Sequence, residues 1–263
     1  MILLYFSLPL LIICYFIFLY FYQENFIFKN GNKLDRNYNF QFKNYFEEIF
    51  IKTPYSSEIN AVHFKLKKPK GVILFCHGNK GNLLIWGERV QFFLDYNYEV
   101  LVFDYRSYGK STGDFNENGM YKDGLCVYNH LQNQFIEKHI VVYGFSLGGT
   151  FATHIARHYN PKALILEAPF FNLGKAVYYY SKFIPRFLVK YKFRTDTDIV
   201  NVKSPIIMFH GNKDLTTFYK ESIELINLNN SKQNSYFIID GGTHHNIKDT
   251  DIYKDKMKEI LMD

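Results

Sequence analysis

The sequence Val141-Val142-Tyr143-Gly144-Phe145-Ser146-Leu147-Gly148-Gly149-Thr150-Phe151-Ala152 decides the fold of this chain. Its apolar beginning is typical of a buried strand, and its end is typical of the start of a helix. Between them lies Gly144-Phe145-Ser146-Leu147-Gly148, a G-x-S-x-G motif. A strand-to-helix turn this tight strains the serine backbone and needs small neighbours. The motif predicts that Ser146 presents its hydroxyl above the end of a sheet, at a helix N-terminus. A glycine-rich turn with an exposed serine is the alternative.

A serine hydroxyl is a weak nucleophile at neutral pH and needs a base, usually a histidine held by a carboxylate. Asp214 follows one apolar segment, and the pair His244-His245 follows the next, so the order is Ser, Asp, His. Adjacent side chains diverge along an extended backbone, so only one imidazole can bridge Ser146 and Asp214. We expect His244 to do so and His245 to point elsewhere. Glu167, at the end of another apolar segment, is the alternative acid.

Two backbone N–H groups are needed to stabilise the negative charge that develops on the attacked carbonyl oxygen. One is expected from Leu147, directly after the candidate nucleophile. The other is expected from the loop Cys76-His77-Gly78-Asn79-Lys80-Gly81-Asn82, where we assign the N–H of Asn79. His77 precedes the serine in the sequence, so we expect it to brace this loop rather than to act as the base. The segment from Asp104 to Ser111 is also expected to brace neighbouring loops.

The chain after residue 45 alternates between strand-like and helix-like segments, which predicts an α/β fold. We expect a mostly parallel eight-stranded sheet with helices on both faces, because several strand candidates are continuous apolar runs. The strands are predicted at residues 48–52, 59–66, 72–76, 99–103, 140–143, 163–167, 206–209 and 236–239. The helices are predicted at residues 83–94, 120–134, 147–158, 218–228 and 252–261. The longest gap between strands covers about residues 171–204.

The first 22 residues contain no Asp, Glu, Lys, Arg or His. As a helix they would span about 33 Å, which is enough for a hydrocarbon core of ~30 Å. They are therefore predicted to be a transmembrane signal anchor. A cleaved signal peptide is the alternative, but it needs a basic start and small residues at its cleavage site, where Tyr20-Phe21-Tyr22 is bulky.

The anchor prediction sets the expected domain organisation. Residues 1–22 are the anchor, residues 23–45 a linker and residues 46–263 the catalytic domain. Basic residues follow the apolar segment and none precedes it. This asymmetry favours a single-pass protein with a cytoplasmic catalytic domain.

The composition is that of an ordinary globular protein, with 48% hydrophobic and 21% charged residues. Cys14, Cys76 and Cys126 are too few and too far apart for a disulfide framework or a zinc ribbon. His154 and His158 have a helical spacing but lack the glutamate of an H-E-x-x-H motif. No phosphate-binding loop, dinucleotide fingerprint or EF-hand is visible. We therefore expect no cofactor, no metal and no nucleic-acid partner.

Together these motifs resemble the α/β-hydrolase superfamily. The resemblance is carried by His77-Gly78-Asn79, Asp104-Tyr105-Arg106, the G-x-S-x-G motif, Asp214 and His244, and it covers about residues 46–262. The closer likeness is to small single-pass membrane serine hydrolases, which include protein depalmitoylating esterases; prolyl-oligopeptidase-type catalytic domains are more distantly similar. The resemblance implies Ser146 as nucleophile, Asp214 as acid and His244 as base.

The resemblance also implies a short helical cap in the insert at residues 171–204. Between Lys175 and Arg194 this insert has six basic residues and no acidic one, with many aromatic residues between them. It suits an interface with anionic lipid headgroups, and equally a cap that packs on the core. One departure concerns Ser107, where the family pattern has glycine. Because a side chain disfavours positive φ, the conformation of that loop stays open.

Motifs and resemblance predict a membrane-anchored serine hydrolase. We expect it to cleave an ester or thioester, such as an acyl chain on a protein or lipid, through an acyl-enzyme intermediate. The expected partners are this acyl substrate and the lipid bilayer. A serine peptidase or amidase is one alternative, because the same triad serves peptidases. A catalytically silent membrane binding protein with the same fold is another.

Overall fold

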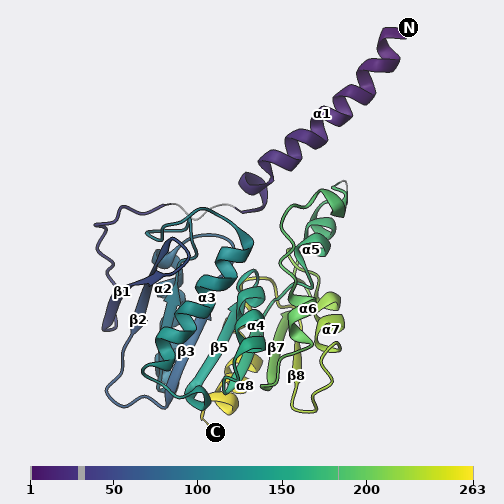
Figure 1. Cartoon of the computed structure of the whole chain (residues 1–263). Helices are drawn as coiled ribbons and strands as arrows, with labels where there is room; N and C mark the ends of the chain where they lie inside the picture. Colours follow the sequence, from purple (N-terminus) through teal and green to yellow (C-terminus); the bar gives the residue numbers. More distant parts are fainter. Residues whose placement is uncertain (1, 29–32, 183, 263) are drawn as a thin grey trace.

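The computed structural model describes residues 2–28, 33–182 and 184–262. Eight strands form one central sheet in the order β1-β2-β4-β3-β5-β6-β7-β8 (Figure 1). The strands are β1 (Phe46–Thr53), β2 (Ser57–Phe64), β3 (Gly71–Cys76), β4 (Tyr98–Phe103), β5 (Ile140–Phe145), β6 (Ala163–Glu167), β7 (Ile206–Gly211) and β8 (Ser235–Ile239).

Strand β2 pairs antiparallel with both β1 and β4, and all other neighbours in the sheet are parallel. Strands β3 to β7 are buried along their whole length. This burial on both faces explains why their sequences are continuous apolar runs. Because parallel strands share one direction, the loops after β3, β5, β7 and β8 meet at the carboxyl edge of the sheet.

Helices cover both faces of the sheet, so the predicted α/β architecture is confirmed (Figure 1). Residues of α3 and α4 belong to one core cluster, and residues of α2 and α8 belong to the cluster on the other face. The α-helices after the first are α2 (Leu83–Val90), α3 (Glu117–Gln132), α4 (Gly148–His158), α5 (Leu173–Tyr180), α6 (Thr195–Ile199), α7 (Tyr219–Ile226) and α8 (Asp251–Met262). The 3₁₀ helices are η1 (Gln91–Tyr96), η2 (Glu137–His139), η3 (Arg186–Leu188) and η4 (Ile247–Asp249).

The insert between β6 and β7 contains α5, η3 and α6. Its last part is anchored in the main core, because Val189, Tyr191 and Phe193 are buried there. In contrast, Tyr180 and Phe187 expose 80% and 79% of their surface. The insert therefore has a packed base and an exposed apolar outer part.

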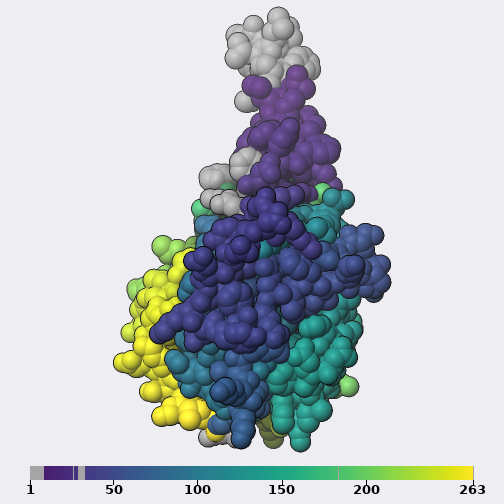
Figure 2. Space-filling view, turned by 90° about the vertical axis from the view of Figure 1, so that its left-hand side faces the viewer, coloured from purple at the N-terminus to yellow at the C-terminus, as the bar shows by residue number. Residues whose placement is uncertain are grey.

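Helix α1 (Ile2–Ile27) stands out from the body of the protein (Figures 1 and 2). The predicted transmembrane helix is not supported by the structure: among the described residues, no helix combines the length and the apolar character needed to cross a membrane. The domain boundaries at residues 22 and 45 stay predictions. Within the expected linker, α1 continues to Ile27, and Phe28 and Phe40 are buried against the catalytic domain.

Candidate active site

Ser146 lies in the turn between β5 and α4 with a φ of +52°, in the left-handed region that residues with a side chain rarely adopt. Its backbone N–H donates to the carbonyl oxygen of Glu167 at 2.9 Å, which holds the turn. Two glycines make the turn possible. A Cβ on Gly148 would lie 1.9 Å from the carbonyl oxygen of Cys76, and one on Gly144 would lie 2.5 Å from the Cα of Gly149.

Three of the predicted site residues meet at the carboxyl edge of the sheet. His244 Nε2 lies 3.1 Å from Ser146 Oγ, and His244 Nδ1 lies 2.7 Å from Asp214 Oδ2. Ser146 comes from the turn after β5, Asp214 from the loop after β7, and His244 from the loop after β8. All three are buried, with 8%, 3% and 6% of their surface exposed. The arrangement is a hydrogen-bonded chain from carboxylate to imidazole to hydroxyl.

The carboxylate of Asp214 is saturated with donors. Its Oδ1 accepts the N–H groups of Thr216 and Thr217 at 2.7 and 2.9 Å, and its Oδ2 accepts the Thr217 hydroxyl at 2.9 Å. Burial alone would raise the pKa of Asp214, but the hydrogen bonds from His210 and His244 outweigh it and hold the pKa well below its usual range. An ionised carboxylate only accepts hydrogen bonds, so the proton of a neutral His244 lies on Nδ1. Its Nε2 then faces Ser146 with a free lone pair.

His210 is a functional candidate that the sequence reasoning missed. It is fully buried at the end of β7, its Nε2 lies 3.1 Å from Asp214 Oδ2, and its Nδ1 lies 2.5 Å from Ser222 Oγ. The signal in the sequence is the spacing of His210 four residues before Asp214, directly after an apolar segment. Asp214 therefore lies between two imidazoles, only one of which contacts Ser146.

Two predicted alternatives lie outside the hydrogen-bonded chain. His245 is exposed, and its carbonyl oxygen lies 3.5 Å from Arg89 Nη1. Desolvation and the neighbouring charges of His244 and Arg89 lower its pKa. Glu167 instead receives Arg89 Nη2 at 2.8 Å and the Tyr143 hydroxyl at 2.7 Å. The structure therefore does not bring Glu167 to His244.

The loop after β3 packs directly on the turn that carries Ser146. A Cβ on Gly78 would lie 2.8 Å from the ring of Phe145. In the described part of the chain, no hydrogen bond uses the backbone N–H of Asn79 or of Leu147. His77 Nδ1 donates to the Gly78 carbonyl oxygen at 2.7 Å, and His77 Nε2 lies 3.3 Å from Asp104, whose pKa is raised by burial. His77 thus braces the loop, as expected.

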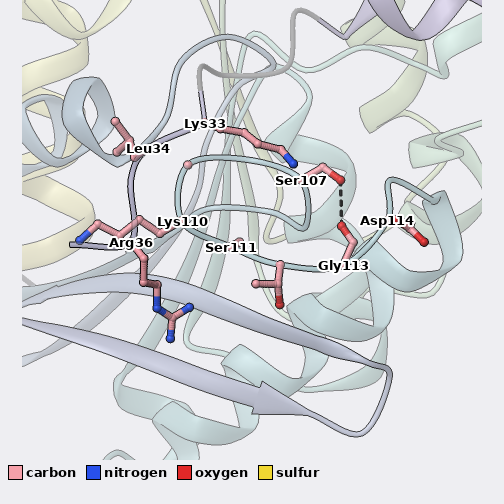
Figure 3. Close-up of a pocket in the computed structure, with 10 residues that line it drawn as sticks. Lys33, Leu34, Arg36, Ser107, Lys110, Ser111, Gly113 and Asp114 are labelled. Carbon is pink, nitrogen blue, oxygen red and sulfur yellow. Dashed lines mark hydrogen bonds between the residues drawn. The ribbon is translucent and has the colours of Figure 1, made fainter. Parts of the chain in front are cut away.

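Ser107 adopts the left-handed conformation that the family pattern assigns to glycine, with a φ of +68°. Its hydroxyl donates to the carbonyl oxygen of Gly113 at 2.9 Å, which closes the loop beside a hollow of about 370 Å³ (Figure 3). The neighbouring Arg106 binds Asp123 through two nitrogens at 2.7 and 2.9 Å. The serine thus compensates part of its backbone strain with a hydrogen bond that glycine could not make.

His154 Nδ1 lies 2.7 Å from Asp198 Oδ2, and its ring centroid lies 4.4 Å from that of His158, with the two rings tilted by 51°. Across the residues that the structure describes, no group of three or more His, Cys, Asp or Glu side chains could hold a metal ion.

A family model described as serine aminopeptidase, S33, a hydrolase family, matches residues 67–201, just over half of the chain. The chain belongs to this hydrolase family. Among curated relatives, uncharacterized protein R595 of Acanthamoeba polyphaga mimivirus is 27% identical over 75% of each chain. The lysophosphatidylserine lipase ABHD12 of Danio rerio is 30% identical over 60% of this hydrolase and 47% of the lipase. This hydrolase thus spans about half the length of the lipases that it matches.

Solved structures establish the fold. The esterase Pf2001 of Pyrococcus furiosus superposes with a TM-score of 0.71 at 19% identity, over 89% of this hydrolase and 98% of the esterase. An α/β-hydrolase from Vibrio vulnificus superposes with a TM-score of 0.68 at 18% identity, over 82% and 81%. The family model, the curated relatives and this fold together confirm the α/β-hydrolase superfamily predicted from the sequence.

Proposed function

We propose that this chain is a serine hydrolase that cleaves the acyl ester bond of a lipid, with Ser146, His244 and Asp214 as its catalytic triad. The observation that carries the proposal is the chain of two hydrogen bonds that joins the three side chains, at 3.1 and 2.7 Å. A hydroxyl next to a neutral imidazole, itself held by a carboxylate, is the arrangement that activates a serine for attack.

The proposed reaction has two halves. Ser146 Oγ attacks the carbonyl carbon while His244 Nε2 takes the hydroxyl proton. The N–H groups of Asn79 and Leu147 stabilise the negative oxygen of the tetrahedral intermediate. The intermediate collapses, the leaving alcohol takes the proton from His244, and the acyl group stays on Ser146. Water then attacks the acyl-enzyme while His244 Nε2 takes a proton from it, and His244 returns this proton to Ser146 Oγ as the fatty acid leaves. Asp214 fixes the tautomer of His244 and stabilises its charged form.

Two features favour a lipid as the substrate. Several curated relatives are named lysophosphatidylserine lipases, and the insert that follows the carboxyl end of β6 has exposed aromatic and basic side chains. Lysophospholipids are therefore the first substrates to test. Thioesters and aminoacyl amides share the same carbonyl chemistry and belong in the same panel.

We also propose that residues 1–22 hold the protein in a membrane, with the catalytic domain on the cytoplasmic side. Those residues have no charged side chain, and large apolar side chains of α1, among them Leu10, Leu11 and Phe21, are exposed. Basic residues follow the segment and none precedes it. The protein should stay in the membrane fraction after washing with high salt and with alkaline carbonate; release by either treatment would contradict the anchor.

The experiment for the function compares the wild type with Ser146→Ala. The variant should lose fluorophosphonate labelling and lower turnover by ~10³-fold or more, because triad members act as a unit. Ser235→Ala is the matched control, since Ser235 begins β8 at the opposite end of the sheet.

The substrate panel separates the remaining functions. Turnover of lysophospholipid esters above thioesters and amides supports the proposal. A preference for aminoacyl amides would make the protein a peptidase. A Ser146→Ala variant that is labelled like the wild type would remove Ser146 from the mechanism, and a wild type that is neither labelled nor active would leave the binding-protein interpretation.

A further inference from the structure

The end of α1 is fixed to the insert by polar contacts. The Gln23 side chain is buried, its Nε2 donates to the Leu188 carbonyl oxygen at 3.2 Å, and its Oε1 accepts the Lys190 N–H at 2.8 Å. Glu24 receives Lys190 Nζ at 2.9 Å and also the Tyr191 hydroxyl. These contacts join segments that lie more than 160 residues apart in the sequence. The last turn of α1 therefore has a defined position on the catalytic domain.

Phe28, directly after α1, adds an apolar contact with the catalytic domain. It is 1% exposed, and its ring centroid lies 4.7 Å from that of Phe115 and 5.6 Å from that of Phe193. Phe193 packs in turn on Phe151 of α4, the helix that follows the candidate nucleophile. The position of the end of α1 is thus set by the hydrophobic core.

A second contact joins α1 to the loop after β3. The carbonyl oxygen of Ile27 accepts a hydrogen bond from Asn79 Nδ2. The last carbonyl groups of a helix have no donor within the helix, so this side chain satisfies one of them. At its other end, Asn79 Oδ1 lies 3.2 Å from the buried Tyr108 hydroxyl, which lies equally far from the Asn79 carbonyl oxygen. Both ends of the Asn79 amide are therefore held.

We propose that the last turn of α1 positions the oxyanion-binding loop, and that the Asn79 side chain is the positioning contact. The proposal rests on the role proposed above for the Asn79 N–H. A peptide group is planar, and His77 holds the Gly78 carbonyl oxygen of the peptide group that carries this N–H. The backbone can still rotate at Asn79 Cα, on the other side of this N–H. The contacts of the Asn79 side chain with Ile27 and Tyr108 restrain that rotation. Helix α1 then takes part in hydrolysis even with a substrate dissolved in water.

The test is a double-mutant cycle in the full chain, solubilised in detergent, with a soluble short-chain ester. Asn79→Ala keeps the backbone N–H but loses the side-chain contacts with Ile27 and with Tyr108. Phe28→Ala removes the ring that fixes the end of α1 and leaves the residues of the loop unchanged. Each should lower kcat about tenfold, because small misplacements of reacting groups are costly. KM should not change, because the contact with the oxyanion forms only in the transition state. Tyr22→Ala, an exposed residue of α1, should behave as the wild type.

The combined variant decides the proposal. It should also lose about tenfold, because both substitutions break one link. A hundredfold loss would show independent effects and overturn the proposal, as would a wild-type kcat in either single variant or an effect on KM alone. If Phe28→Ala does not fold, Gln23→Ala takes its place in the cycle. If Ser146→Ala is inactive and the losses of the two single variants add in the combined variant, only the positioning role is refuted. If Ser146→Ala is active, the proposed function itself is refuted.

Discussion

Asp214 is held by two imidazoles, a hydroxyl and two backbone N–H groups. This set of donors does more than orient His244, because it keeps the carboxylate ionised in a buried position. His210 contacts the same carboxylate oxygen as His244, and Ser222 in turn lies against its other ring nitrogen. We interpret His210 as a positioning residue for the carboxylate, since it does not contact the candidate nucleophile.

The low pKa of Asp214 predicts a pH-dependent contribution to stability. In the unfolded chain an aspartate titrates near ~3.9, above the pKa in the folded protein. The stabilisation is therefore present above about pH 4 and is lost as the pH falls towards the folded pKa, because the unfolded chain binds the proton first. Denaturant unfolding from pH 6 to pH 3 should show a steeper loss of stability for the wild type than for Asp214→Asn. Asp95→Asn, at an exposed carboxylate, is the control. Parallel curves for wild type and Asp214→Asn would contradict the prediction.

The two neighbouring histidines give a paired prediction. His244→Ala should abolish ester turnover, because no base then faces Ser146, whereas His245→Ala should keep most of it. Steady-state kinetics with a soluble ester measures both. An inactive His245→Ala with an active His244→Ala would reverse the assignment, and activity in both variants would remove the triad from the mechanism.

At the scale of elements, the turn from β5 to α4 depends on close backbone approach. A Cβ on Gly148 would meet the Cys76 carbonyl oxygen at 1.9 Å, and backbone atoms cannot move aside as a flexible side chain can. Gly148→Ala should therefore destabilise the protein by about 1–3 kcal/mol and impair turnover, as measured by denaturant unfolding and kinetics. Gly174→Ala, in α5, is the matched control, because the nearest atom to the added Cβ is Asn172 Oδ1 at 3.5 Å. Equal stability of the two variants would show that the turn tolerates a side chain.

The sequence predicted every strand to within two residues at each end, because strands buried on both faces are continuous apolar runs. Helix ends were less accurate. The segment predicted as one helix from residue 83 changes at Val90 into η1, and α3 begins at Glu117 rather than 120, where the Asn116 side chain caps it. Strand ends and motif order placed Ser146, Asp214 and His244 at one edge. The docking of Phe28 depends on tertiary packing, which leaves no local pattern in the sequence. The contact of His210 with Asp214 leaves only their spacing of four residues.

On the scale of the whole molecule, α1 and the insert lie at the same end as the candidate triad (Figure 1). The loop after β3 contacts the end of α1, and the insert follows the carboxyl end of β6. The exposed Tyr180 and Phe187 lie on that insert, together with the exposed Lys182 and Arg186. An enzyme built this way would have its membrane-facing elements and its reacting groups on one side, so a lipid substrate would have a short path to Ser146.

This arrangement predicts that basic residues of the insert favour anionic lipid surfaces. Each basic side chain near such a surface is worth about 1 kcal/mol, so the variant with both Lys182→Gln and Arg186→Gln should raise the apparent KM for a lysophospholipid in anionic mixed micelles by roughly 10- to 30-fold. In zwitterionic micelles, and with a soluble ester, the KM should stay that of the wild type. The control replaces Lys67 and Lys68, exposed in the turn between β2 and β3 at the opposite end of the sheet, and removes the same charge. If the control variant shows the same rise in KM, net charge rather than the insert attracts the surface. If neither variant shows a rise, the insert is a cap whose basic residues do not bind the anionic surface.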